Sequence, residues 1–132
     1  MIVLDTHILI WWATGDIAKL SANAITAINQ ELEGGEIIIS SITAWEIAML
    51  VAKERIVISM DLEQWLSTIA QIEAVKFYAV DNDIAVKSAI LPGEFHKDPA
   101  DRMVVATARK LGCGLLTADE KIIHYQHVKT IW

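Results

Sequence analysis

Short apolar runs alternate with helical patterns along the whole chain. The runs fall at residues 2–5, 36–40, 75–80, 114–119 and 128–132. Helical patterns fall between them, at residues 21–35, 41–55, 61–72, 81–91 and 99–111, with one or two helical turns near residues 119–125. Strands that alternate with helices form parallel sheets covered on both faces. The pattern therefore predicts an α/β fold, a three-layer α/β/α sandwich around a mostly parallel five-stranded sheet.

Apolar residues at helical spacing predict which helix faces are buried. In residues 41–55 these apolar residues are Ile42, Trp45, Met49 and Ala52. In residues 99–111 they are Val104, Val105, Ala108 and Leu111. Trp65 lies on a similar stripe in residues 61–72. We therefore expect Trp45 and Trp65 to face the core.

Length and composition suit one domain. With 132 residues, 54% of them hydrophobic, residues 1–132 can bury a single core. The only cysteine, Cys113, cannot form an internal disulfide, which suits a reducing compartment. The apolar start lacks the charged region and cleavage site of a signal peptide and is too short to span a membrane. We expect a single domain in the cytoplasm, with no membrane association.

Carboxylates gather at one edge of the predicted sheet. Asp5 ends the first strand, and Asp119 lies just past the fourth. Glu46 lies in the first turns of the helix after the second strand, and Asp98 and Asp101 begin the helix that leads into the fourth. Carboxyl ends of parallel strands share one edge, where ligands bind near a switch in strand order. We therefore expect these five carboxylates to converge.

Each carboxylate also has a purely structural explanation. Asp5, Asp98 and Asp119 can cap helices or turns, and Glu46 can be an ordinary surface residue. Asp101 is harder to explain in this way, because it lies one turn before the buried stripe of its helix. Like charges on one rim repel each other, and a divalent cation removes that cost. Two explanations of these carboxylates therefore remain at this point: a site for a cation, or a set of helix caps.

The available ligands favour a hard cation. Mg²⁺ and Mn²⁺ prefer carboxylate oxygens and water, and such an ion suits the hydrolysis of a phosphodiester. No histidine or cysteine set has zinc-like spacing. No Gly-rich phosphate loop and no catalytic serine or cysteine arrangement competes. His96 is the histidine near the acidic rim, and we consider it for contact with substrate.

Four blocks of sequence stand out along the chain: LDTHILIWW, SSITAWEIAML, HKDPADRMVVATA and LLTADEKI. In order and spacing they resemble the PIN-domain ribonucleases and, more closely, the VapC toxins of prokaryotic toxin–antitoxin modules. The resemblance implies a Mg²⁺- or Mn²⁺-dependent endoribonuclease whose acidic quartet is Asp5, Glu46, Asp101 and Asp119. For the metal it implies Asp5, Asp101 and Asp119, and Asp98 either as a further ligand or only as a helix cap.

The resemblance also implies supporting groups and partners. Thr6, Ser41 and Thr117 lie where the family often places hydroxyl groups beside the acids, so we expect them to support the site. RNA substrate, a cognate VapB-like antitoxin and a homodimer are usual in the family. Trp11 and Trp12 are adjacent and cannot both face one core. We expect one of them to serve a dimer or antitoxin contact.

The charge of the chain conflicts with binding to RNA. Eleven Lys and Arg residues against 17 Asp and Glu give a net charge of −6, whereas nucleic-acid-binding proteins usually show a basic surface. The resemblance implies a groove with a few local cations, for which Arg102, Lys97 and Lys53 are candidates. For each of them alone, solvated surface charge is the commoner explanation. An acidic pocket also suits a basic side chain of an antitoxin.

Other classes of protein fit parts of the pattern. Receiver domains and aspartyl-nucleophile phosphatases also place Asp at strand ends of α/β/α sheets. The phosphatases need a second Asp two residues after the nucleophile, but Asp5 is followed by Thr6 and His7. The receiver pattern needs an acid pair near the first strand, and that pair is missing. A non-catalytic or antitoxin-binding α/β module, whose acids only cap helices, is the third possibility.

Overall fold

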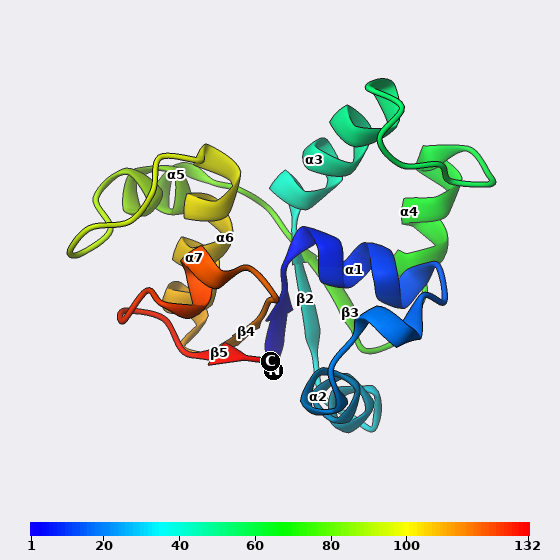
Figure 1. The fold of residues 1–132 in the computed structure, drawn as a ribbon, viewed down its shortest axis with the longest axis horizontal. Coiled ribbons are helices and arrows are strands. Elements are labelled where there is room, and N and C mark those ends of the chain that lie inside the picture. The colour runs from blue at the N-terminus through cyan, green and yellow to red at the C-terminus, as the bar shows by residue number, and fades with distance from the viewer.

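The computed structural model describes residues 1–132 and confirms the predicted alternation of strands and helices (Figure 1). The strands are β1 (Ile2–Leu4), β2 (Ile37–Ser40), β3 (Val75–Tyr78), β4 (Gly114–Leu116) and β5 (Thr130–Ile131). The helices are α1 (Thr6–Ala13), α2 (Ala22–Leu32), α3 (Ser41–Ala52), α4 (Leu62–Ala70), α5 (Asn82–Ala89), α6 (Pro99–Leu111) and α7 (Glu120–Ile123), with a 3₁₀ turn at Ile17–Lys19. None of these helices has the length and apolarity needed to cross a bilayer.

The sheet contains all five strands in the order β3-β2-β1-β4-β5, and every pairing is parallel. The chain places β2 and then β3 on one side of β1. It then crosses over through α5 and α6 to place β4 on the other side. The strand order therefore reverses between β1 and β4. In open sheets of this kind, the crevice beyond the carboxyl ends of such neighbouring strands is the usual ligand site.

Helices cover both faces of the sheet and form two separate cores. One core lies under α1 to α4, and the other lies under α5 to α7, on the opposite side of the sheet (Figure 1). Successive strand residues point to opposite faces, so Leu4 enters the first core and Val3 the second. Both side chains are fully buried. This arrangement confirms the predicted α/β/α sandwich.

Helix α3 differs from the prediction in the face that it buries. Its buried residues are Thr43 and Ile47, and the Trp45 side chain is 56% exposed. The expectation that Trp45 faces the core is therefore wrong. Trp65 on α4 meets the same expectation, because it is only 7% exposed. Helix α3 carries apolar residues of its own on every side, so the spacing of apolar residues cannot identify its buried face.

Candidate active site

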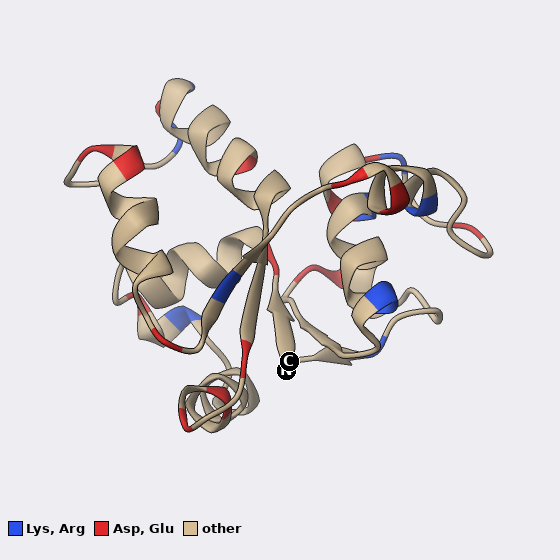
Figure 2. Ribbon diagram, turned by 180° about the vertical axis from the view of Figure 1, so that it is seen from behind, with Lys and Arg blue, Asp and Glu red and all other residues tan.

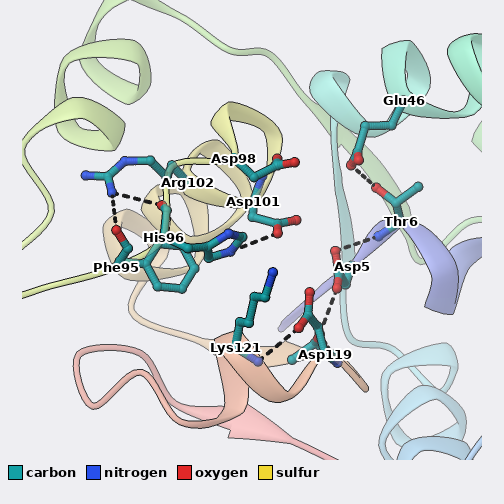
Figure 3. Close-up of polar contacts among 11 residues, drawn as sticks. Asp5, Thr6, Glu46, Phe95, His96, Asp98, Asp101, Arg102, Asp119 and Lys121 are labelled. Atoms are coloured by element: carbon teal, nitrogen blue, oxygen red, sulfur yellow. Dashed lines mark hydrogen bonds and ion pairs between the residues drawn. The ribbon is translucent and has the colours of Figure 1, made fainter.

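An acidic cleft of about 460 Å³ lies beyond the carboxyl ends of β1 and β4, where the strand order reverses. Its lining residues are Asp5, Thr6, His7, Trp11, Glu46, Asp98, Asp101, Ala118 and Asp119. The carboxylates come from the end of β1, from α3, from the start of α6 and from the loop after β4 (Figure 3). The structure thus brings together all five carboxylates that the sequence placed at this edge.

Asp5 is the most deeply buried of these acids, with only 8% of the residue exposed. It caps α1, because its Oδ1 accepts a hydrogen bond of 2.9 Å from the Thr6 amide. Its Oδ2 accepts a second bond, of 2.7 Å, from the Thr117 hydroxyl. Burial raises the pKa of Asp5, although these two bonds oppose the shift. The carboxylate is therefore both a helix cap and a fixed acid in the cleft.

Glu46 is held by threonine hydroxyls. The Thr6 hydroxyl donates to Glu46 Oε1 at 2.5 Å and lies 3.3 Å from the buried Thr43 hydroxyl. Burial raises the pKa of Glu46, and the charges of Asp5 and Asp98 raise it further. Thr43 was missed from the sequence, although it lies three residues before Glu46 and so on the same side of the helix.

Ser41 is not brought to the site. It lies exposed in the first turn of α3 and is absent from the cleft wall. Thr6 and Thr117, the two other hydroxyl residues expected beside the acids, both make direct hydrogen bonds to them. Ser41 therefore makes no contact with the acids, and the Thr43 hydroxyl contacts only the Thr6 hydroxyl, at 3.3 Å.

Asp98 and Asp101 share the first turn of α6. Asp98 caps the helix, since its Oδ1 accepts a 3.0 Å bond from the Asp101 amide. The Asp101 side chain is only 17% exposed. Burial, followed by the charges of the other four carboxylates, raises the pKa of Asp101 to about 8. Without a cation, Asp101 therefore carries a proton for much of the time at neutral pH.

Asp119 completes the wall of the cleft, and His96 lies next to the wall, against Asp101. Asp119 caps α7 by accepting a 2.9 Å bond from the Lys121 amide, and its own amide donates to the Thr117 hydroxyl at 3.1 Å. The Thr117 hydroxyl thus links Asp119 to Asp5. His96 Nε2 is buried and lies 3.0 Å from Asp101 Oδ2, but it makes no aligned hydrogen bond there (Figure 3).

Arg102 faces away from the carboxylates (Figure 3). Its guanidinium donates to the backbone carbonyl oxygens of Ser88, Ala89, Phe95 and His96, at 2.7, 3.4, 3.0 and 3.2 Å. All three of its nitrogens are therefore occupied by backbone. In this arrangement, Arg102 cannot also serve as the RNA contact for which the sequence made it a candidate.

No lysine or arginine lines the cleft. Lys53 and Lys97, the other two cations considered for RNA binding, are exposed outside it. Seen from behind, acidic segments of both helical layers meet at this end of the sheet (Figure 2). His7 and Trp11 are the remaining large side chains in the wall, and their rings lie 5.9 Å apart. The wall of the cleft therefore carries five carboxylates and no lysine or arginine to balance them; His7 is its one basic side chain.

The donor set fits a hard divalent cation. Five carboxylates offer the oxygen ligands that Mg²⁺ and Mn²⁺ prefer. A cation would relieve their mutual repulsion, which adds to burial in raising the pKa of Asp101. In the structure no three acidic or histidine side chains converge on one point at ligand distance. Binding therefore requires rotation of side chains, which the exposed Asp98 and the half-buried Asp119 can undergo most freely.

A larger cavity, of about 620 Å³, lies apart from these acids. It is lined by Trp12, Ala13, Thr14, Val57, Ile58, Ser59, Met60, Trp65, Thr68, Ile69 and Ile72. None of these side chains carries a charge or titrates near neutral pH. Despite its size, this apolar cavity offers no group for acid–base or metal chemistry, so the acidic cleft is the candidate active site.

Comparison with known proteins places this fold and site in one class. Residues 2–128 match the family model for the PIN domain. The chain is 32% identical to the ribonuclease VapC22 of Mycobacterium tuberculosis, over 99% of this chain and 98% of that protein. The chain therefore belongs to the PIN-domain family, among the VapC ribonucleases of toxin–antitoxin modules.

Solved structures share the same fold at lower identity. VapBC2 of Rickettsia felis, bound to a DNA fragment from its promoter, aligns with a TM-score of 0.68 and 18% identity, over 98% of this chain and 97% of that one. A toxin–antitoxin complex from Klebsiella pneumoniae aligns with a TM-score of 0.63 and 24% identity, over 97% and 95%. VapC20 of M. tuberculosis, which cleaves the sarcin–ricin loop, aligns with a TM-score of 0.62 and 16% identity, over 98% and 99%.

Proposed function

We propose that residues 1–132 act as a single PIN-like domain, a Mg²⁺- or Mn²⁺-dependent endoribonuclease that serves as the toxin of a type II toxin–antitoxin module. The observation that carries the proposal is the convergence of five carboxylates in one cleft that has no lysine or arginine. Such a cleft repels the phosphates of RNA unless a cation intervenes. Membership of the VapC ribonucleases supports the assignment of RNA as the substrate.

Asp5, Glu46, Asp101 and Asp119 are the proposed catalytic acids. Asp5, Asp101 and Asp119 hold the metal, with Asp98 as a further ligand or as a helix cap only. A bound Mg²⁺ or Mn²⁺ ion supplies an activated water and neutralises the phosphoryl oxygens of the substrate.

The protein fixes two of these acids before any ligand arrives. The Thr6 amide and the Thr117 hydroxyl orient Asp5, and the Thr6 hydroxyl orients Glu46. Outer groups of this kind commonly matter for metal affinity. Burial and the neighbouring carboxylates raise the pKa of Asp101 to about 8, so a cation bound there would favour its ionised form. The His96 ring lies against Asp101 and limits where that carboxylate can turn.

The proposed partners are a cognate VapB-like antitoxin and a second copy of the chain. Solved relatives include toxin–antitoxin complexes, which supports the first partner. The negative cleft suits a basic side chain from such a protein. For the homodimer, Trp45 on α3 offers a large exposed apolar side chain. The proposed location is the cytoplasm, where RNA and an antitoxin are both available.

Cleavage of a total-RNA pool tests this proposal. We expect discrete fragments from purified protein with Mg²⁺ or Mn²⁺, and none with EDTA, with Asp5→Asn or with Asp101→Asn. Asp83→Asn is the matched control, because Asp83 is an exposed acid on α5 that pairs with Lys87 and Lys110. It should cleave like the natural protein. Absence of cleavage by folded, antitoxin-free protein would contradict the proposal and favour a non-catalytic, antitoxin-binding module whose acids cap helices.

A further inference from the structure

The residues between α5 and α6 form neither a helix nor a strand, and they reach the acidic cleft at their last residue. This 90–98 segment ends at Asp98, which lines the cleft and caps α6, and it carries His96, which lies against Asp101. Its backbone polar groups have no helix or sheet partners, so they must be satisfied in another way. The groups that satisfy them determine how firmly the segment is held.

We propose that Arg102 is a positioning residue that fastens the 90–98 segment against α6 and so holds His96 and Asp98 at the cleft. This inference rests on the proposed function, because it assigns Arg102 a part in building the metal site. Arg102 acts through the backbone of the segment and not by touching RNA. It follows Asp101 directly in the sequence, so one helix turn carries both an acid of the cleft and the group that holds the segment leading into that turn.

The guanidinium geometry carries this assignment. Nη1 donates to the carbonyl oxygens of Phe95 and His96, within the segment. Nε and Nη2 donate to the carbonyl oxygens of Ser88 and Ala89, at the end of α5, where helix carbonyls lack partners. A planar guanidinium can donate in these directions at once, whereas an ammonium group cannot reproduce the fork.

A second anchor holds the other end of the segment. The Tyr125 hydroxyl donates to the Pro92 carbonyl at 2.5 Å. The Phe95 ring packs between the rings of His96 and Tyr125, at centroid distances of 4.5 and 4.6 Å. Because Tyr125 secures Pro92 independently, loss of Arg102 should release the His96 end of the segment and leave the rest of the fold in place.

Arg109 provides a matched control on the same helix. It lies seven residues after Arg102, and its guanidinium donates to the His127 carbonyl, away from the acidic cleft. Arg109 borders one cavity with Ile90 and Pro92 but makes no hydrogen bond to the 90–98 segment. Arg109→Met therefore removes a positive charge and a contact between arginine and backbone while it leaves the hydrogen bonds of the segment in place. Arg102→Met removes the fastening, and Arg102→Lys keeps the charge but not the fork.

Limited proteolysis with EDTA present tests the fastening without reference to catalysis, because the segment carries exposed cleavage sites at Glu94 and Lys97. We expect faster cleavage after these two residues in Arg102→Met, an intermediate rate in Arg102→Lys and natural rates in Arg109→Met, with thermal unfolding confirming that each variant folds. Unchanged proteolysis of Arg102→Met, or natural behaviour of Arg102→Lys, overturns the proposal. If the natural protein fails to cleave RNA, the proposed function fails, while proteolysis still decides whether Arg102 fastens the segment.

Mg²⁺ titration of RNA cleavage tests the link to the metal site. For Arg102→Met we expect the Mg²⁺ concentration that gives half-maximal cleavage to rise about 10- to 100-fold, as when outer groups of a metal site are lost. The RNA concentration for half-maximal rate should stay unchanged, and Arg109→Met should match the natural protein. A raised RNA requirement with a natural Mg²⁺ requirement would overturn the proposal and make Arg102 an RNA contact.

Discussion

Adjacent tryptophans on α1 line two cavities of opposite character. Trp11 lies in the wall of the acidic cleft, and Trp12 in the wall of the apolar cavity. The apolar cavity is the larger, at about 620 against 460 Å³, and large apolar pockets are the usual first candidates for ligand sites. Of the two cavities, only the smaller, acidic cleft is lined by side chains that titrate near neutral pH or carry charge. Convergence of charge at a strand switch is therefore the better guide to chemistry in this molecule.

The two cavities should also differ in how they affect stability, and the largest expected effect is the pH response of the acidic cleft. With EDTA, the folded-state pKa of Asp101, about 8, lies above its ordinary value of 3.8. Between these pH values the folded state keeps a proton that the unfolded chain has released. The free energy of unfolding should therefore fall as pH rises from about 4 to about 8, by up to ~1.4 kcal/mol per pH unit.

Urea denaturation at a series of pH values measures this fall. Asp5 and Glu46 also have raised pKa values, so they act in the same direction. Asp101→Asn should flatten the profile, and Mg²⁺ should restore stability most strongly near pH 8, where the carboxylates are ionised. An equally steep profile in Asp101→Asn would show that the cleft is not its origin.

On the apolar side, Trp65→Ala should cost stability without affecting catalysis. Trp65 is buried against the first core and lines the apolar cavity, so truncation enlarges an existing void. We expect a loss of about 3 kcal/mol in the free energy of unfolding. Cleavage per folded molecule should stay natural. Thr68→Ala, an exposed change on the same cavity wall, should stay within about 0.5 kcal/mol. Loss of cleavage in folded Trp65→Ala would contradict this prediction and show that the apolar cavity affects catalysis in the acidic cleft.

The acidic cleft was predictable from sequence because sheet topology places it. Parallel strands align their carboxyl ends, so residues just past β1 and β4 had to meet at one edge. The predicted strand of residues 114–119 ends in the structure at Leu116, and the hydroxyl of the next residue, Thr117, donates to Asp5. The resemblance to PIN domains identified the same acids by another route. The alternation of strands and helices was sufficient to predict the three layers, and together with the family motifs it was sufficient to predict which acids line the cleft.

The supporting contacts were not predictable in the same way. Arg102 binds carbonyl oxygens of the 90–98 segment, whose path no periodicity describes. Trp45 was misplaced because α3 is apolar all round. Ser41 was expected at the site because the resemblance to the family placed a hydroxyl there, and Thr43 was overlooked. Helical spacing gives relative angles between residues, but the direction of the helix face comes only from packing. Sequence therefore located the acids better than the groups that hold them.

A smaller effect should follow from removing one of those supporting groups. The Thr117 hydroxyl donates to Asp5 Oδ2 and accepts from the Asp119 amide. Thr117→Val keeps the shape and leaves both partners unsatisfied, so we expect a loss of about 1–3 kcal/mol in stability. RNA cleavage should fall about 10- to 100-fold. Thr107→Val is the control, because that buried hydroxyl bonds only to Met103 within α6. Equal cleavage by both variants would contradict the role of Thr117.

The smallest effect expected concerns the two tryptophans of α1 and tests the comparison directly. Trp12 borders the apolar cavity, which suits a protein partner, so Trp12→Ala should weaken assembly by about 1–2 kcal/mol. Trp11→Ala should leave assembly intact, because its ring packs on His7 and Trp132 of its own chain. Native mass measurement of the chain, alone and co-expressed with its antitoxin, distinguishes dimer from antitoxin contacts. Unchanged assembly in both variants would contradict a role of the apolar cavity in binding a partner. Loss of assembly in Trp11→Ala alone would show that the partner binds at the acidic cleft instead.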